Sequence, residues 1–120
     1  MNIVPITINQ NPYSHCEETL YFVESANDLS LNTSEQLKQI LRQAEIQLAL
    51  AGCAQKHLMS VSMYLKDFED IEAINTIWYE WKQLHCKTTR ACFKAEMSHP
   101  DCLVEVSFMV CQNHLQTIQA

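Results

Sequence analysis

Residues 102–111, CLVEVSFMVC, are the stretch that decides the fold of this chain. Side chains alternate between two faces along a β-strand. One face of this segment carries Cys102 followed only by valine and phenylalanine, and the other, counted from Leu103, is also largely apolar. A strand that is apolar on both faces has to be covered on both sides. We therefore expect helices on one face and a neighbouring subunit on the other, because 120 residues leave no third helix to serve as cover.

The segment that precedes this strand has the same alternation. Residues 89–97 place Arg90 and Cys92 on one face, and residues 98–101, SHPD, have the composition of a turn. We expect a β-hairpin, which would put Arg90 and Glu105 on adjacent strands.

A long helix is predicted upstream. Thr33 and Gln36 have the T-x-x-Q spacing of a capping box, in which each side chain satisfies a backbone donor. Apolar residues follow at helical spacing as far as Ala51. Gly52, the only glycine, stands where the chain would turn into the left-handed conformation after the helix.

A second helix is expected after a cap at Asp67 or Asp70. Its apolar stripe consists of Phe68, Ile71, Ile74, Ile77, Trp78, Trp81 and Leu84. Three more strands are predicted at residues 3–8, 20–23 and 58–65. The order β-β-α-β-α-β-β predicts a single α+β domain over residues 1–120, with two helices on one face of a mixed sheet.

The composition excludes several classes of function. The formal net charge is −6, and the 8 Lys and Arg residues are scattered, whereas nucleic-acid binding requires clustered cations. No apolar run approaches the ~18 residues of a membrane helix. The first ten residues lack the cationic segment of a signal peptide. We expect a cytoplasmic protein that binds neither nucleic acid nor membranes.

Six cysteines raise the question of disulfides and metals. Nothing marks a secreted protein, so we expect reduced thiols. The chain has no CxxC pair, and the spacings fit no common zinc site, so no metal is expected.

Three stretches together resemble the Rid/YjgF family, whose members are also described as reactive intermediate imine deaminases, endoribonuclease L-PSP-like or translation-initiation-inhibitor-like proteins. The first, residues 34–53, is similar to the family's long helix with its Ala-Gly end. The second, residues 57–82, is similar to a strand, an Asp-centred turn and a helix entered through an Asn. The third, residues 88–110, is similar to the P-x-R strand, a loop and the L-V-E-I strand, with Thr88 in place of the Pro.

The resemblance implies a chorismate-mutase-like fold and a homotrimer with clefts between subunits. Active members hydrolyse reactive enamines and imines derived from amino acids, without a cofactor, to ammonia and 2-keto acids. By motif match, Arg90 binds the substrate carboxylate and Glu105 handles the attacking water or a proton, while Asn75 lies near the cleft. A guanidinium suits the first role because it binds carboxylates bidentately.

Four more residues are candidates for contact with the substrate. Tyr13 aligns with the family's cleft tyrosine, and Cys92 lies two residues after Arg90. Glu24-Ser25 stands where the family usually has Ser-Gly, which places a side chain and a negative charge at that point.

Three hypotheses follow. The protein is an imine or enamine hydrolase, a non-catalytic trimer that binds a small carboxylate or a protein partner, or a structural trimer. In the last case Arg90 and Glu105 form only an ion pair. For Cys92 we favour a small buried apolar residue over a nucleophilic thiol.

Overall fold

The computed structural model describes residues 3–6, 16, 18–82 and 88–112. These residues form the predicted order of elements, with one short 3-10 helix, η1, added. The elements are β1 (Ile3–Ile6), β2 (Glu18–Ser25), α1 (Thr33–Leu50), η1 (Gln55–His57), β3 (Leu58–Leu65), α2 (Ile71–Trp81), β4 (Thr89–Lys94) and β5 (Val104–Gln112).

The strands form one five-stranded mixed sheet in the order β1-β2-β5-β3-β4. All neighbouring pairs are antiparallel except β3 and β4, which are parallel. Parallel neighbours need a crossover connection, and α2 supplies it between β3 and β4. The predicted α+β class with a mixed sheet is confirmed.

The predicted hairpin between the last two strands is wrong. β3 lies between β4 and β5, so Arg90 and Glu105 are not on adjacent strands. The connection over residues 95–103 passes the end of β3, where the Ala95 amide donates to Leu65 O and the Lys66 amide donates to Leu103 O. The turn near residues 98–101 does form, but alternation shows which face a side chain takes and not which strand lies next to it.

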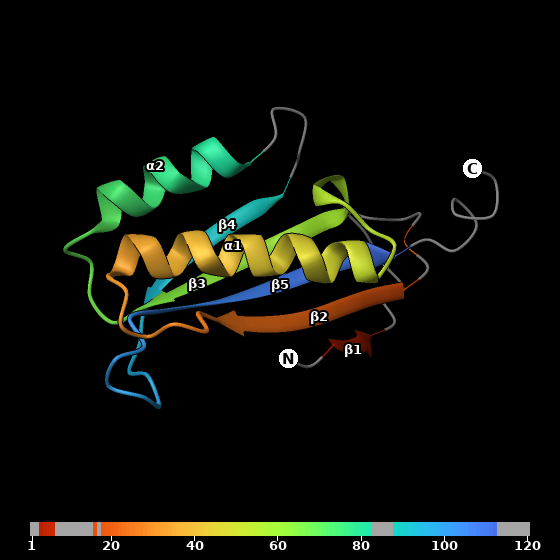
Figure 1. Ribbon diagram of the computed structural model, residues 1–120. Coiled ribbons are helices and arrows are strands. Elements are labelled where there is room, and N and C mark those ends of the chain that lie inside the picture. The colour runs from red at the N-terminus through yellow and green to blue at the C-terminus, as the bar shows by residue number, and fades with distance from the viewer. Residues whose placement is uncertain (1–2, 7–15, 17, 83–87, 113–120) are drawn as a thin grey trace.

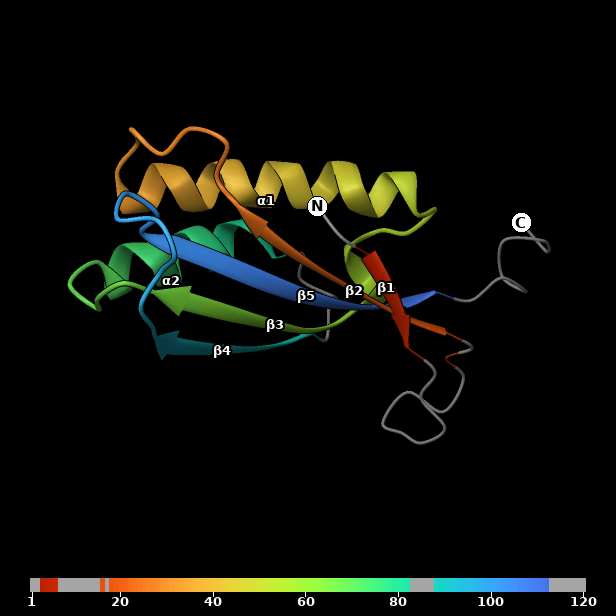
Figure 2. The ribbon, with the colours of Figure 1, turned by 90° about the horizontal axis from the view of Figure 1, so that it is seen from below.

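Both helices lie on one face of the sheet, as predicted (Figure 1). α1 runs along the sheet over β2 and β5, and Figure 2 shows it lying on one side of the strands. The core between helices and sheet contains the inward residues of β5, which are Val104, Val106, Phe108 and Val110. We call the other side of the sheet the open face, because no helix among the described residues lies on it.

The start of α1 differs from the prediction, and its end agrees with it. Asn32, not Thr33, is the N-cap, and its Oδ1 accepts a hydrogen bond from the Glu35 amide at 2.9 Å. Asparagine is a somewhat better N-cap than threonine, so the residue type favoured Asn32, whereas the capping-box spacing pointed to Thr33. Gly52 follows the helix with φ of +72°, the expected left-handed conformation.

The start of α2 also differs in detail from the prediction. Asp70 occupies the N-cap position, but its side chain makes no capping hydrogen bond. Asp67 instead accepts from the Glu69 amide within the preceding turn. Neither α1 nor α2, nor any other helix in the described ranges, has the length and apolar character to cross a bilayer.

A row of glutamines on α1 holds the chain segments that flank the helix. The fully buried Gln36 donates to Leu31 O and Asp101 O, and its Oε1 accepts from the Leu103 amide. One turn later, Gln39 Oε1 accepts from the Asp28 amide at 2.8 Å. The side chain that was predicted to complete a capping box therefore joins α1 to the segment leading into β5.

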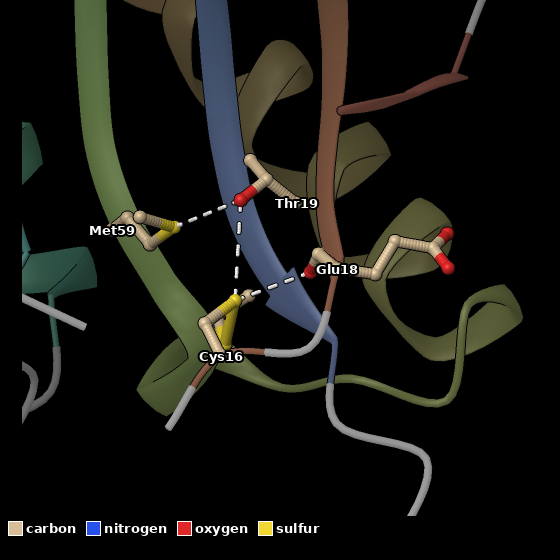
Figure 3. Close-up of a disulfide and its surroundings, with 5 residues drawn as sticks. Cys16, Glu18, Thr19 and Met59 are labelled. Atoms are coloured by element: carbon tan, nitrogen blue, oxygen red, sulfur yellow. Dashed lines mark hydrogen bonds between the residues drawn. A yellow bond between two sulfur atoms is a disulfide. The ribbon is translucent and has the colours of Figure 1, made fainter. Parts of the chain in front are cut away.

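A disulfide joins Cys16, just before β2, to Cys111 on β5 (Figure 3). This corrects the expectation that all thiols are reduced. The pairing follows from the register, because Cys111 lies opposite Thr19 and the two cysteine Cα atoms are 5.6 Å apart, within the usual range for a disulfide. The Thr19 hydroxyl lies 3.9 Å from Cys16 Sγ and 3.8 Å from Met59 Sδ, as the dashed lines in Figure 3 mark.

Candidate functional site

Arg90 lies on β4 and extends toward the helices. It is in register with Val61, a core residue of β3, so its side chain shares the helix-covered face. Its Nη2 donates to Asn75 Oδ1 at 2.6 Å. Its guanidinium carbon lies 5.8 Å from the centroid of the Trp78 ring, a cation–π distance.

Asn75 and Trp78 reach Arg90 together because they are three residues apart on α2, which places them on one side of the helix. The Asn75 oxygen accepts a hydrogen bond from one guanidinium nitrogen, and the Trp78 ring lies at cation–π distance from the guanidinium group. Among the residues that the structure describes, Arg90 forms no salt bridge with a carboxylate. The half-buried cation is therefore oriented by neutral groups, and most of its five N–H donors remain for other partners.

Cys92 is two residues further along β4, on the same face as Arg90. It is in register with the fully buried Met63 and packs, partly buried, against the core. The structure thus brings together three of the predicted site residues, Asn75, Arg90 and Cys92, at the β4 side of the sheet.

Glu105 lies on the open face of the sheet. It is in register with Ser25 of β2 and with Tyr64 of β3, and it is half-buried. It lines a cavity of about 330 Å³ whose other lining residues are Tyr21, Val23, Tyr64, Ala95, Glu96, Met97 and Ser107. Two tyrosines, a serine and a second carboxylate therefore surround Glu105.

Glu105 also affects a nearby thiol. Burial raises the pKa of the Cys102 thiol, and the negative charge of Glu105 raises that pKa further. Cys53 also has a raised pKa, and there burial is the cause. Both thiols are consequently less ionised at neutral pH than an exposed cysteine, which argues against a nucleophilic role for either.

Glu24 and Ser25 point to opposite sides of β2. Glu24 is buried on the helix side, and its Oε1 accepts from Gln43 Nε2 at 2.9 Å. Ser25 is exposed and lies opposite Glu105, while its carbonyl oxygen accepts from the same Gln43 nitrogen at 3.0 Å. Glu24 is not among the described lining residues of the cavity of Glu105, although Val23 lines both that cavity and the one beside Glu24. Its contact with a substrate stays a prediction.

Two predictions remain, the contact of Tyr13 with the substrate and the absence of a metal site. Tyr13 lies outside the described residues. Across the described ranges, no three His, Cys, Asp or Glu side chains gather as a metal site requires. Sequence reasoning missed Gln43, which fixes Glu24. A signal was present, because Gln36, Gln39, Gln43 and Gln47 recur at helical spacing beside the apolar stripe of α1.

Comparison with known proteins agrees with this fold. The family model described as endoribonuclease L-PSP matches residues 19–112. A RutC family protein of Haemophilus influenzae is 27% identical over 88 residues, which cover 72% of this chain and 76% of that protein.

Solved structures show the same architecture. An uncharacterised protein from Pseudomonas aeruginosa has a TM-score of 0.75 and 29% identity, over 79% of this chain and 84% of that one. A YjgF family member from Neisseria meningitidis has a TM-score of 0.74 over 92% of this chain and 96% of that one. Its identity of 22% shows the shared fold alone.

Proposed function

We propose, from the premise that this chain belongs to the endoribonuclease L-PSP family, which includes the Rid/YjgF proteins, that it hydrolyses small imino or enamino acids to 2-keto acids and ammonia. One observation carries the proposal. Arg90 is a half-buried guanidinium that Asn75 and Trp78 orient, and no carboxylate of the described residues neutralises it. A fixed cation of this kind is suited to bind the carboxylate of a small substrate.

The binding step uses the geometry of the guanidinium. Asn75 Oδ1 accepts from Nη2, which restricts rotation of the Arg90 head group before a substrate arrives. A substrate carboxylate can then accept two parallel N–H bonds from the remaining donors. Lysine could not replace this arrangement, because an ammonium offers a point charge and not a planar pair of donors.

Glu105 is the proposed acid and base. Its carboxylate takes a proton from water while the water oxygen bonds to the C=N carbon, and it returns that proton to the nitrogen. This gives a carbinolamine, in which the carbon carries a hydroxyl and an amino group. The same carboxylate then takes the hydroxyl proton and delivers it to the amino group as the C–N bond breaks, so ammonia leaves and the carbon becomes the carbonyl of the 2-keto acid. The overall change is imine plus water to ketone plus ammonia, so no oxidant, reductant or cofactor is needed.

The proposed site is shared by two subunits of a cytoplasmic homotrimer. Arg90 and Glu105 lie on opposite faces of one sheet, so a single chain cannot present both to one small substrate. In the proposed trimer, a neighbouring subunit covers the open face and places the β4 strand that carries its own Arg90 next to Glu105. This arrangement also agrees with the apolar character of Tyr21, Val23 and Met109 on the open face.

The experiment is a coupled assay in which an amino-acid oxidase generates 2-iminopropionate and ammonia release is followed. We expect acceleration by the wild-type protein and a loss of about 100-fold or more in kcat/KM for Arg90→Ala, since charge-assisted hydrogen bonds disappear. Arg42→Ala, on the exposed side of α1, is the matched control and should retain full activity. Absence of acceleration, or full activity in Arg90→Ala, would refute the proposal.

A second function is favoured by the pair Glu24-Ser25, which stands where the family usually has Ser-Gly. In this alternative the trimer binds a small carboxylate or a protein partner without hydrolysis. A thermal-shift screen of 2-keto and amino acids separates the two functions. Stabilisation that depends on Arg90, without turnover in the imine assay, would support binding alone.

A further inference from the structure

A polar cavity of about 400 Å³ lies between the end of β2 and α1. Its described lining residues do not include Arg90 or Glu105, and it shares Val23 with the cavity of Glu105. Its polar lining comes from Glu24, Ser25, Asn27, Gln43 and Gln47, and its apolar lining from Val23 and Ile46. The volume falls within the range of sites that hold small molecules. No Lys or Arg is among its lining residues in the part of the chain that the structure describes.

Among the described residues of this lining, Glu24 is the one with an ionisable side chain. The residue is only 7% exposed, and Gln43 Nε2 is the donor that reaches its Oε1. In the described part of the chain no cation pairs with it. A carboxylate offers about four acceptor positions, and burying one without a counter-charge is unfavourable. The site therefore has unmet capacity to accept hydrogen bonds from a positively charged group.

Gln43 cannot supply what Glu24 lacks, because its own groups are engaged. Its Nε2 donates both to Glu24 Oε1 and to Ser25 O, and its Oε1 accepts from the Asn27 amide at 3.2 Å. These bonds fix the carboxylate in place instead of neutralising it. They also make the Asn27 amide a local reporter of events in the cavity.

We propose that this cavity binds a protonated aliphatic primary amine, with the ammonium group on the Glu24 carboxylate. An ammonium has three donors and no acceptor, which complements a fixed carboxylate beside side-chain amide oxygens. The alkyl part of such a ligand can lie against Ile46, whose side chain is 60% exposed at the cavity. The proposal does not depend on imine hydrolysis, because the group that binds the ammonium is Glu24 and neither Arg90 nor Glu105 of the same chain is among the described lining residues.

The test uses butylammonium chloride as the probe, with 1-butanol and sodium butyrate as neutral and anionic probes of similar length. Binding is measured by calorimetry and by the ¹H–¹⁵N signal of the Asn27 amide. We expect butylammonium to bind and to shift that signal, while the other two probes do not. Binding to Glu24→Gln should be at least about tenfold weaker, since a charge-assisted hydrogen bond is lost.

Two further variants complete the design. Glu80→Gln removes the same charge from the exposed surface of α2 and should bind butylammonium as the wild type does. Gln47→Lys places an ammonium beside the cavity and should both abolish butylammonium binding and raise the melting temperature, so it reports on the site even if Glu24→Gln is unstable. Equal binding of 1-butanol, unchanged binding in Glu24→Gln, or a change of oligomeric state in Glu24→Gln without an effect on amine binding would overturn the proposal.

Discussion

Arg90 and Glu105 extend from opposite faces of the same sheet, and β3 lies between the strands that carry them. Arg90 is in register with Val61 and Glu105 with Tyr64, so they are also offset by three residues along β3. Two strand spacings and this offset each separate them by about 10 Å. Any reaction that uses both residues on one small substrate therefore requires two copies of the chain.

Complementation between variants should reveal this shared site. Arg90→Ala and Glu105→Gln should each be inactive alone, because every cleft then lacks one group. When the two are mixed, unfolded and refolded together, about a quarter of the clefts regain Arg90 from one subunit and Glu105 from the other. The imine assay on the mixture should recover about that share of wild-type activity. If mass spectrometry shows mixed trimers but the mixture regains no activity, the shared site would be contradicted. The two residues would then act within one chain's site or take no part in the reaction.

Breaking the disulfide should destabilise the protein substantially. Cys16 and Cys111 are 95 residues apart, and the loss of such a long closed loop from the unfolded ensemble is expected to lower the free energy of unfolding by about 2–5 kcal/mol. Urea unfolding of Cys111→Ser against wild type measures the change. Cys53→Ser, which removes a free thiol, is the comparison. Wild-type stability that does not respond to dithiothreitol would contradict the bond's contribution.

Replacing Gln36 should cost more than replacing the glutamine one turn later. Gln36→Leu leaves the Leu103 amide and two carbonyl groups without their buried partner, so we expect about 2–4 kcal/mol of destabilisation. Gln39→Ala removes one bond at the surface and should cost below about 1 kcal/mol. Chemical denaturation of both variants checks the difference. Equal effects would mean that the buried bonds contribute no more than the exposed one.

The thiol of Cys102 should become more acidic when Glu105 is neutralised. Burial and the Glu105 charge both raise the pKa of this thiol, so Glu105→Gln removes a repulsion from the thiolate and lowers the pKa toward its ordinary value. The pH profile of iodoacetamide labelling, followed by peptide mass spectrometry, should shift to lower pH. Cys53 is an internal control, because burial alone raises its pKa. A parallel shift at Cys53 would point to general loosening of the fold.

The type and order of the elements could be predicted from the sequence because each depends on local periodicity. The alternation in residues 102–111 and the apolar stripe of α1 identified the buried face correctly, as did residues 60–65. At the start of β3 a register shift places Leu58, and not Met59, in the core cluster. The neighbour of each strand could not be predicted in this way. A turn at residues 98–101 is compatible with a hairpin and with a connection that passes over β3, and long-range pairing selects the second.

The candidate site was predictable in its residue types and not in its geometry. Arg90 and Asn75 were identified from motif positions, and the structure joins them by a hydrogen bond. The direction of Glu24 depends on its contact with Gln43, and the disulfide depends on the register of β2 and β5. Such contacts join residues far apart in the chain, so no local pattern reports them.

The bond between Cys16 and Cys111 makes a covalent ring of everything from the start of β2 to the end of β5. A protease that cuts the exposed connection after β4 would open this ring without releasing a fragment. The two pieces would stay attached through sulfur and through the sheet, and they would separate only in denaturant with reductant. In the oxidised protein the two pieces therefore stay covalently linked after a single cut. In the reduced protein only the strand pairing and the core hold them together.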